Sequence, residues 1–154
     1  MTEPAFIAAP DLTRRPPRSL RCRLGGYVIL PRMLDKGRAT LVGKNGAFIY
    51  NASFDQHLVN FLAFDADALL KELATGAGDS EILEWLKRNA ERQPSRWEIE
   101  QWSDYQVRRS PDSDARTLFF FYGSVGRLSR TREDIRSWMD LIDLDDFVTF
   151  GGKA

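Results

Sequence analysis

The chain has 154 residues, of which 43% are hydrophobic, and equal numbers of basic and acidic side chains give it zero net charge. This length predicts one domain, which buries about two-thirds of the surface of the unfolded chain. The single cysteine excludes an intrachain disulfide, and no apolar run approaches the ~20 residues that span a bilayer. We therefore expect a cytoplasmic protein that makes no membrane contact.

The zero net charge conceals a strong asymmetry along the chain. Residues 1–44 carry nine basic and three acidic side chains, a net charge of +6, and residues 45–154 carry a net charge of −6. We call the basic arm 14–23 together with the helix face 32–38 the basic front. Its charge predicts either an anionic partner or a front that packs on the protein's own acidic body, and the sequence leaves both interpretations open.

The first segments in chain order are a tail and an arm. Residues 1–10 are expected to be a flexible tail, and residues 11–154 a single helical domain. Pro16 and Pro17 fix their φ angles, which predicts an extended basic arm over 14–23. A pair of glycines then permits a sharp change of direction before the first helix.

The following segments have the spacing of helices. Pro31 suits the first turn of a helix with one apolar face, formed by Leu30, Met33, Leu34, Gly37 and Leu41. The glycine in that face predicts a close backbone approach. A turn at 44–46 precedes a short strand or extended piece at 47–50. A helix with Phe54, Leu58, Phe61 and Leu62 on one face follows, and start signals at Asp65, Asp79 and Ser95 predict three more helices.

The last third of the chain predicts two more helices. Residues 115–128 contain the run Leu118–Tyr122, apolar all round, which favours a central buried helix, with a buried strand as the alternative. The segment Gly123–Gly126 in that helix predicts close helix packing. A capping-box pattern at Thr131 and Asp134 predicts the start of the final helix. The expected fold is all-α, a compact bundle of six or seven short helices with an extended basic arm and at most one small extended element.

Catalytic and metal-binding patterns are weak. The chain has one cysteine and one histidine, Cys22 and His57, and the cysteine lies in the arm, a poor place for precise catalytic geometry. No phosphate-binding glycine loop occurs. The acidic residues 140–146 lack the later glycine and terminal glutamate of a calcium loop, so we expect them to pair with the basic front. No cofactor and no metal is predicted.

The leading hypothesis is a non-enzymatic binding module. Its basic front would engage an acidic protein surface or a phosphate-bearing molecule, with nucleic acid as a weaker option. The expected charge-assisted contacts come from four basic side chains, with Asp35 orienting the neighbouring guanidinium groups: Arg15, Arg18, Arg32 and Lys36.

Two other functions stay open. One is a small enzyme in which His57 or Asp55 acts as a general base in a polar pocket of six residues: Tyr27, Arg32, Asp35, Tyr50, Asp55 and His57. The other is a structural homodimer that uses the aromatic side chains, which make up 12% of the chain.

Several blocks of the chain resemble a known bacterial family. They include Asp11–Ser19, Leu24–Tyr27 and, most specifically, Leu30–Lys36 with Arg38 and Ala39. Further matches lie at Gly43–Lys44, Tyr50–Asn51, Asp55 and 134–143. The family is known only as domain of unknown function 5069. The resemblance implies a mostly helical, cytoplasmic bacterial protein, and it supplies no activity, cofactor or catalytic residue.

Overall fold

A computed structural model of the chain describes residues 3–111 and 114–154. Over these residues it contains seven helices and no sheet, which confirms the predicted all-α class. The helices are α1 (Leu30–Leu41), α2 (Ser53–Leu62), α3 (Ala66–Leu73), α4 (Asp79–Asn89), α5 (Arg96–Arg108), α6 (Ala115–Leu128) and α7 (Trp138–Thr149). Residues 47–50 form turns and irregular chain, so of the two alternatives predicted there, a short strand or an extended piece, the strand is wrong.

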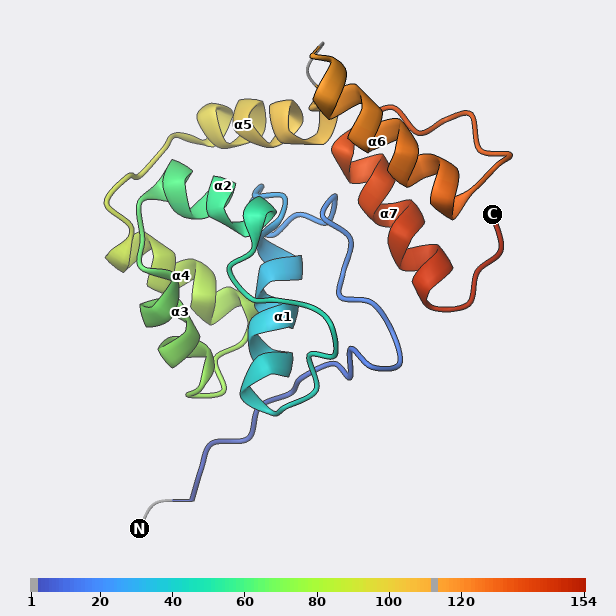
Figure 1. Cartoon of the computed structure of the whole chain (residues 1–154). Helices are drawn as coiled ribbons and strands as arrows, with labels where there is room; N and C mark the ends of the chain where they lie inside the picture. Colours follow the sequence, from blue (N-terminus) through green and yellow to red (C-terminus); the bar gives the residue numbers. More distant parts are fainter. Residues whose placement is uncertain (1–2, 112–113) are drawn as a thin grey trace.

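Helix α1 is the centre of the fold (Figure 1). It packs against α2 and α3, and every residue from Leu30 to Ala39 is buried. Pro31 occupies the first turn, where its fixed φ suits the helix. A Cβ added at Gly37 would lie 2.7 Å from Cδ1 of Leu73, which confirms the predicted close approach.

Side chains at the predicted positions cap two helices. Asp65 accepts a hydrogen bond from a backbone amide of the first turn of α3, and Ser95 does the same for α5. The start predicted at Thr131 is wrong. Helix α7 begins after Ser137, whose hydroxyl accepts a hydrogen bond from the backbone amide of Asp140. The carboxylate of Asp140 in turn accepts a hydrogen bond from the backbone amide of Ser137. This reciprocal capping box satisfies the amides of the first turn.

Helices α6 and α7 pack on each other around a separate small core of Phe121, Ile135, Leu141 and Leu144. The helix at 115–128 is confirmed, but its predicted central position is wrong, because it lies at the periphery beside α7 (Figure 1). Only one of its faces is covered. A helix with apolar residues on all sides is therefore not necessarily buried on all sides by the rest of its own chain.

The arm and tail run over the surface of the α1–α4 part of the chain. The arm is anchored where Leu20 is buried and its carbonyl accepts a hydrogen bond from the amide of Ile29. Residues 3–10 form no helix or strand, and the predicted flexibility of the tail stays a prediction. Within 3–111 and 114–154, no helix has both the length and the hydropathy required to cross a membrane.

Candidate anion-binding site

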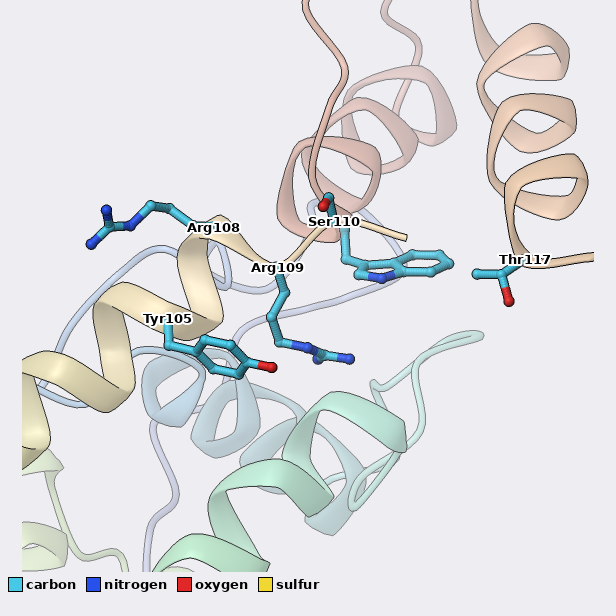
Figure 2. Close-up of a pocket in the computed structure, with 6 residues that line it drawn as sticks. Tyr105, Arg108, Arg109, Ser110 and Thr117 are labelled. Atoms are coloured by element: carbon cyan, nitrogen blue, oxygen red, sulfur yellow. The ribbon is translucent and has the colours of Figure 1, made fainter. Parts of the chain in front are cut away.

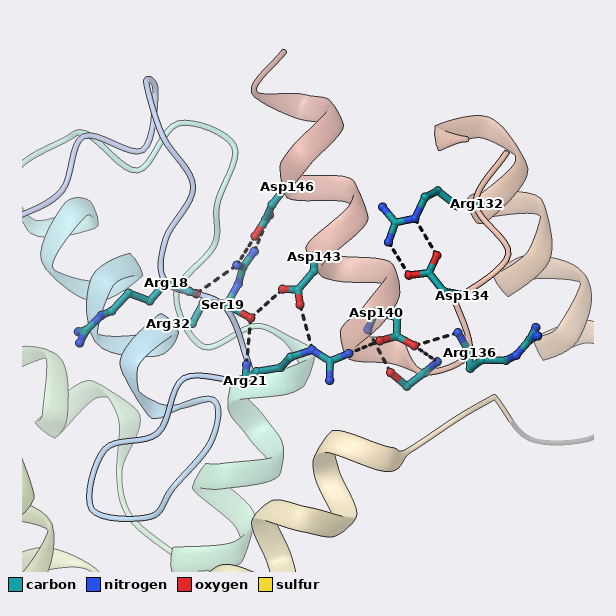
Figure 3. A network of polar contacts seen from close by, with 11 residues as sticks. Arg18, Ser19, Arg21, Arg32, Arg132, Asp134, Arg136, Asp140, Asp143 and Asp146 are labelled. Carbon is teal, nitrogen blue, oxygen red and sulfur yellow. Dashed lines mark hydrogen bonds and ion pairs between the residues drawn. The ribbon is translucent and has the colours of Figure 1, made fainter. Parts of the chain in front are cut away.

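The basic arm lies against acidic side chains of the chain itself. Arg21 pairs with Asp140 and with Asp143 of α7, the second contact at 3.0 Å from Nε to Oδ2. Nη2 of Arg23 lies 2.8 Å from Oδ1 of Asp104 on α5. Figure 3 shows the two α7 carboxylates turned toward the arm. Asp140 and Asp143 of α7 thus pair with the basic front, as expected.

Arg18 is the centre of a four-residue ionic cluster. Its Nη2 lies 3.0 Å from Oδ1 of Asp35, and its Nη1 lies 2.8 Å from Oδ2 of Asp79. Arg38 reaches the other oxygen of Asp79 at 2.8 Å. Burial alone would raise the pKa of Asp79, but hydrogen bonds from the two guanidinium groups outweigh it and lower that pKa below its usual value. The cluster joins the arm to α1 and α4.

The two remaining cations of the helix face 32–38 are paired inside the molecule. Nη1 of Arg32 lies 2.6 Å from Oδ2 of Asp146 (Figure 3), and Nζ of Lys36 lies 2.7 Å from Oδ2 of Asp55. The Asp55 side chain is fully buried and the Lys36 side chain is 7% exposed. Burial lowers the pKa of Lys36 and raises the pKa of Asp55, so each charged form depends on the other.

Two exposed cations next to these pairs lack a carboxylate within ion-pair distance in the described part of the chain. They are Arg15 on the arm and Lys44 in the turn after α1. Both line one groove of about 740 Å³. Residues 6–10 of the tail form one wall of this groove, and Arg18 and Asp35 also line it. Because these last two side chains neutralise each other, the excess positive charge of the groove comes from Arg15 and Lys44.

The chemistry of this groove suits an anion. A guanidinium offers a planar fork of N–H donors and an ammonium offers three more, and both form strong charge-assisted hydrogen bonds with phosphate or carboxylate oxygens. Apolar atoms from the tail and Val42 line the same space. The groove can therefore hold a ligand with a charged group and a less polar body.

The six residues predicted to form one polar pocket do not line a single cavity. Tyr27 is buried in the main core. The Tyr50 hydroxyl donates a 2.7 Å hydrogen bond to the backbone carbonyl of Ala66. His57 Nε2 lies 3.0 Å from a guanidinium nitrogen of Arg109. Tyr27 thus packs in the core, and Tyr50 and His57 have hydrogen-bond partners outside the Arg18–Asp35 contact.

Arg32 and Lys36 do share a cavity, of about 360 Å³, between α1, the 47–54 segment and α7. Its other walls include Phe48, Phe54 and Ile142. Both cations already have carboxylate partners, so the cavity offers no unneutralised charge to a ligand. Of the six residues predicted for the polar pocket, Arg32 lines this cavity, and Asp55 is linked to it through its ion pair with Lys36.

A second basic cavity, of about 450 Å³, lies at the end of α5 (Figure 2). It is lined by Tyr105, Arg108, Arg109, Ser110 and Thr117, and the indole of Trp138 completes the wall. In Figure 2 the hydroxyl of Tyr105 and the guanidinium of Arg109 point to the same side, whereas Arg108 points away. Basic residues at a helix C-terminus also complement the helix dipole, so this cluster has a structural explanation.

Sequence reasoning missed Lys44 and Arg109 as site residues. Lys44 belongs to a turn signal, where a lysine is typical of solvated chain. Its backbone carbonyl accepts a 2.9 Å hydrogen bond from the amide of Leu12, which brings the turn beside the arm. No local pattern could have indicated this contact. Arg109 ends α5 and reaches His57, 52 residues earlier in the chain.

Comparison with known proteins adds a family and no activity. A search of curated proteins found no match to the chain. The family model described as "Domain of unknown function (DUF5069)" matches residues 14–148. The match begins in the basic arm and ends in α7, so it covers all the ion pairs that hold the front against the acidic body. The chain therefore belongs to the DUF5069 family.

Proposed function

We propose that this chain is a bacterial, cytoplasmic binding module without enzymatic activity, and that it holds a small phosphate-bearing ligand in the groove beside its basic front. One observation supports the proposal: Arg15 and Lys44 bring two positive charges to one groove, and neither has a carboxylate within ion-pair distance among the described residues. Arg18 lines the same groove, but Asp35 and Asp79 accept hydrogen bonds from its Nε, Nη1 and Nη2 atoms.

The shape of the groove favours a small ligand over an acidic protein surface. Its volume of about 740 Å³ falls in the usual range for small-molecule sites, roughly 300–1,000 Å³. Stable protein interfaces instead use about 800 Å² of surface on each partner. The tail residues 6–10 form one wall of the groove, so a ligand must fit between this wall and the arm.

The enzyme alternative has less support. Its general bases would be Asp55 and His57, but Asp55 is fully buried against Lys36 and His57 is bonded to Arg109. Burial and the nearby guanidinium both lower the pKa of His57. A neutral His57 is a competent proton acceptor in principle. Among the described side chains, however, its hydrogen-bond partner is Arg109 and not a predicted pocket residue.

The test is isothermal titration calorimetry with pyrophosphate as the probe, and with a polyglutamate peptide as the probe for an acidic protein surface. The variant Arg15→Glu/Lys44→Glu removes both groove cations. The control Lys71→Glu/Arg88→Glu makes the same change in net charge at exposed positions of α3 and α4, away from the groove lining.

The proposal expects pyrophosphate binding that weakens by at least about tenfold in the groove variant, because charge-assisted contacts contribute roughly 1.5–3 kcal/mol each. The control variant keeps the affinity of the wild-type protein. An equal loss in both variants indicates unspecific charge attraction and overturns the proposal. Binding of polyglutamate alone would replace the small ligand with a protein partner.

A further inference from the structure

Helix α6 exposes an unusual amount of aromatic surface. Phe119 is 84% exposed and Tyr122 is 53% exposed, although both belong to an ordered helix. They lie on the side opposite Phe121, the residue that α6 buries against α7. Contiguous exposed apolar surface of this kind marks an interaction site in soluble proteins.

Two glycines lie on the same outward face. Phe119, Tyr122, Gly123 and Gly126 follow the i, i+3, i+4, i+7 spacing of one helix face. No atom lies within 4 Å of a Cβ added at Gly126, and at Gly123 the nearest is a guanidinium nitrogen of Arg127 at 3.9 Å. Within the described residues, these glycines therefore lack the close packing that the sequence predicts.

We propose that this face is the interface of a homodimer in which α6 packs antiparallel on α6 of a second copy. A two-fold axis between Tyr122 and Gly123 sets Phe119 against Gly126 of the partner subunit, and Tyr122 against Gly123 of the partner subunit. The same contacts then repeat with the copies exchanged, as an isologous interface requires. Each aromatic ring meets a position without a side chain, so the two helices approach closely.

The ends of α6 complement each other in charge in this arrangement. Asp114 lies at the N-terminus of α6, and Arg130 follows its C-terminus; both are exposed. Arg130 has no carboxylate within ion-pair distance in 3–111 and 114–154. The antiparallel register brings Asp114 beside Arg130 of the partner subunit, at both ends of the interface. The helix dipoles are also opposed, which favours the antiparallel orientation.

The size of the interface indicates a weak dimer. Four aromatic rings, two from each copy, bury at most about 150–250 Å² each. Their summed area reaches the lower end of specific interfaces only when residues around the rings add contact area. We therefore expect dissociation in the micromolar range. The anion groove and Lys44 lie elsewhere on the chain, so this dimer does not depend on the proposed ligand.

The experiment is sedimentation velocity from low to several hundred micromolar, on the wild-type protein, two α6 variants (Gly126→Leu and Phe119→Ser) and one control variant. Gly126→Leu fills the position that receives the partner's ring, in a place where the monomer has open space. Trp97→Ser is the control, because Trp97 is 60% exposed on α5, away from this face. Circular dichroism verifies that all three variants keep the helical content of the wild type.

The expected result is a concentration-dependent dimer for the wild type and for Trp97→Ser, and a dissociation constant at least roughly 30-fold higher for Gly126→Leu, as for an interface hot spot. Phe119→Ser is expected to act in the same direction. A wild-type protein that stays monomeric at every concentration overturns the proposal. A dimer that keeps its wild-type dissociation constant in both Gly126→Leu and Phe119→Ser also overturns the proposal, because such a dimer must use another surface.

Discussion

The contact between Lys36 and Asp55 allows a sharp test of the energetics of the fold. The two groups lie 2.7 Å apart, one fully buried and the other nearly so. Asp55 also accepts a hydrogen bond from the amide of Ala52 at the start of α2. Replacing Lys36 with methionine keeps most of the apolar stem and removes the charge, so Asp55 is left buried without its counter-ion.

The loss of folding stability in the Lys36→Met variant should be large. Breaking a buried ion pair from one side costs about 3–5 kcal/mol, a substantial part of the 5–15 kcal/mol that typically separates folded from unfolded domains. Urea unfolding followed by tryptophan fluorescence measures it directly, since the chain has four tryptophans. The midpoint should fall by roughly 2 M urea, given slopes of about 1–3 kcal/mol/M for small domains.

The double variant Lys36→Met/Asp55→Asn is the matched control. The asparagine removes the charge but still offers an oxygen to the amide of Ala52, so most of the lost stability should return. A loss below about 1 kcal/mol in Lys36→Met, or a double variant no more stable than the single one, would refute the view that the pair is buried and mutually dependent.

The pH dependence of Lys36→Met follows from the same burial. Burial already raises the pKa of Asp55 above its ordinary value of 3.8, and removal of Lys36 raises it further. Above pH 3.8 the unfolded chain releases this proton before the folded chain does, so the folded state is penalised as pH rises. The stability difference between variant and wild type should therefore shrink as pH falls toward 3.8, in urea titrations repeated across that range.

Three further substitutions can be checked in the same unfolding assay. Arg18→Gln should lower the free energy of unfolding by about 1.5 kcal/mol at pH 7. Because the arginine lowers the pKa of Asp79, this difference should disappear as pH falls below 3.8. A difference that stays constant with pH would argue against the ion pair. Gly37→Ala should destabilise by about 1 kcal/mol despite the better helix propensity of alanine, since the new Cβ would lie 2.7 Å from Cδ1 of Leu73, and a stabilised variant would contradict this. Ser137→Ala should cost about 1 kcal/mol through loss of the cap of α7, and an unchanged midpoint would show that the cap is dispensable.

Local patterns predicted the helices well. The spacing of Leu30, Met33 and Leu34 identified α1 and its buried face, and Pro31 marked its start, because these signals lie within one or two turns of chain. The glycine at position 37 was correctly interpreted as a close approach. Errors arose where capping residues compete, as at Ser137, since several hydroxyl and carboxyl groups stand within a few residues of one another.

Long-range pairing could not be predicted. Arg18 meets Asp79 across 61 residues, and Arg21 meets Asp143 across 122. Charge segregation indicated that the basic front would meet acids. It could not separate the arginines that form ion pairs from Arg15, which forms none with the residues in 3–111 and 114–154. Periodicity likewise could not show what covers Phe119, because it reports the apolar character of a face and not its neighbours.

The central claim is that the basic front divides into internally paired cations and a groove that is still able to bind an anion. The arginine Nε–Hε signals of a ¹H–¹⁵N NMR spectrum, recorded during a pyrophosphate titration, test it most directly. We predict that the Arg15 signal shifts progressively to saturation, whereas those of Arg21 and Arg32, held by carboxylates of α7, stay in place. Shifts at Arg21 and Arg32 without a shift at Arg15 would contradict the account.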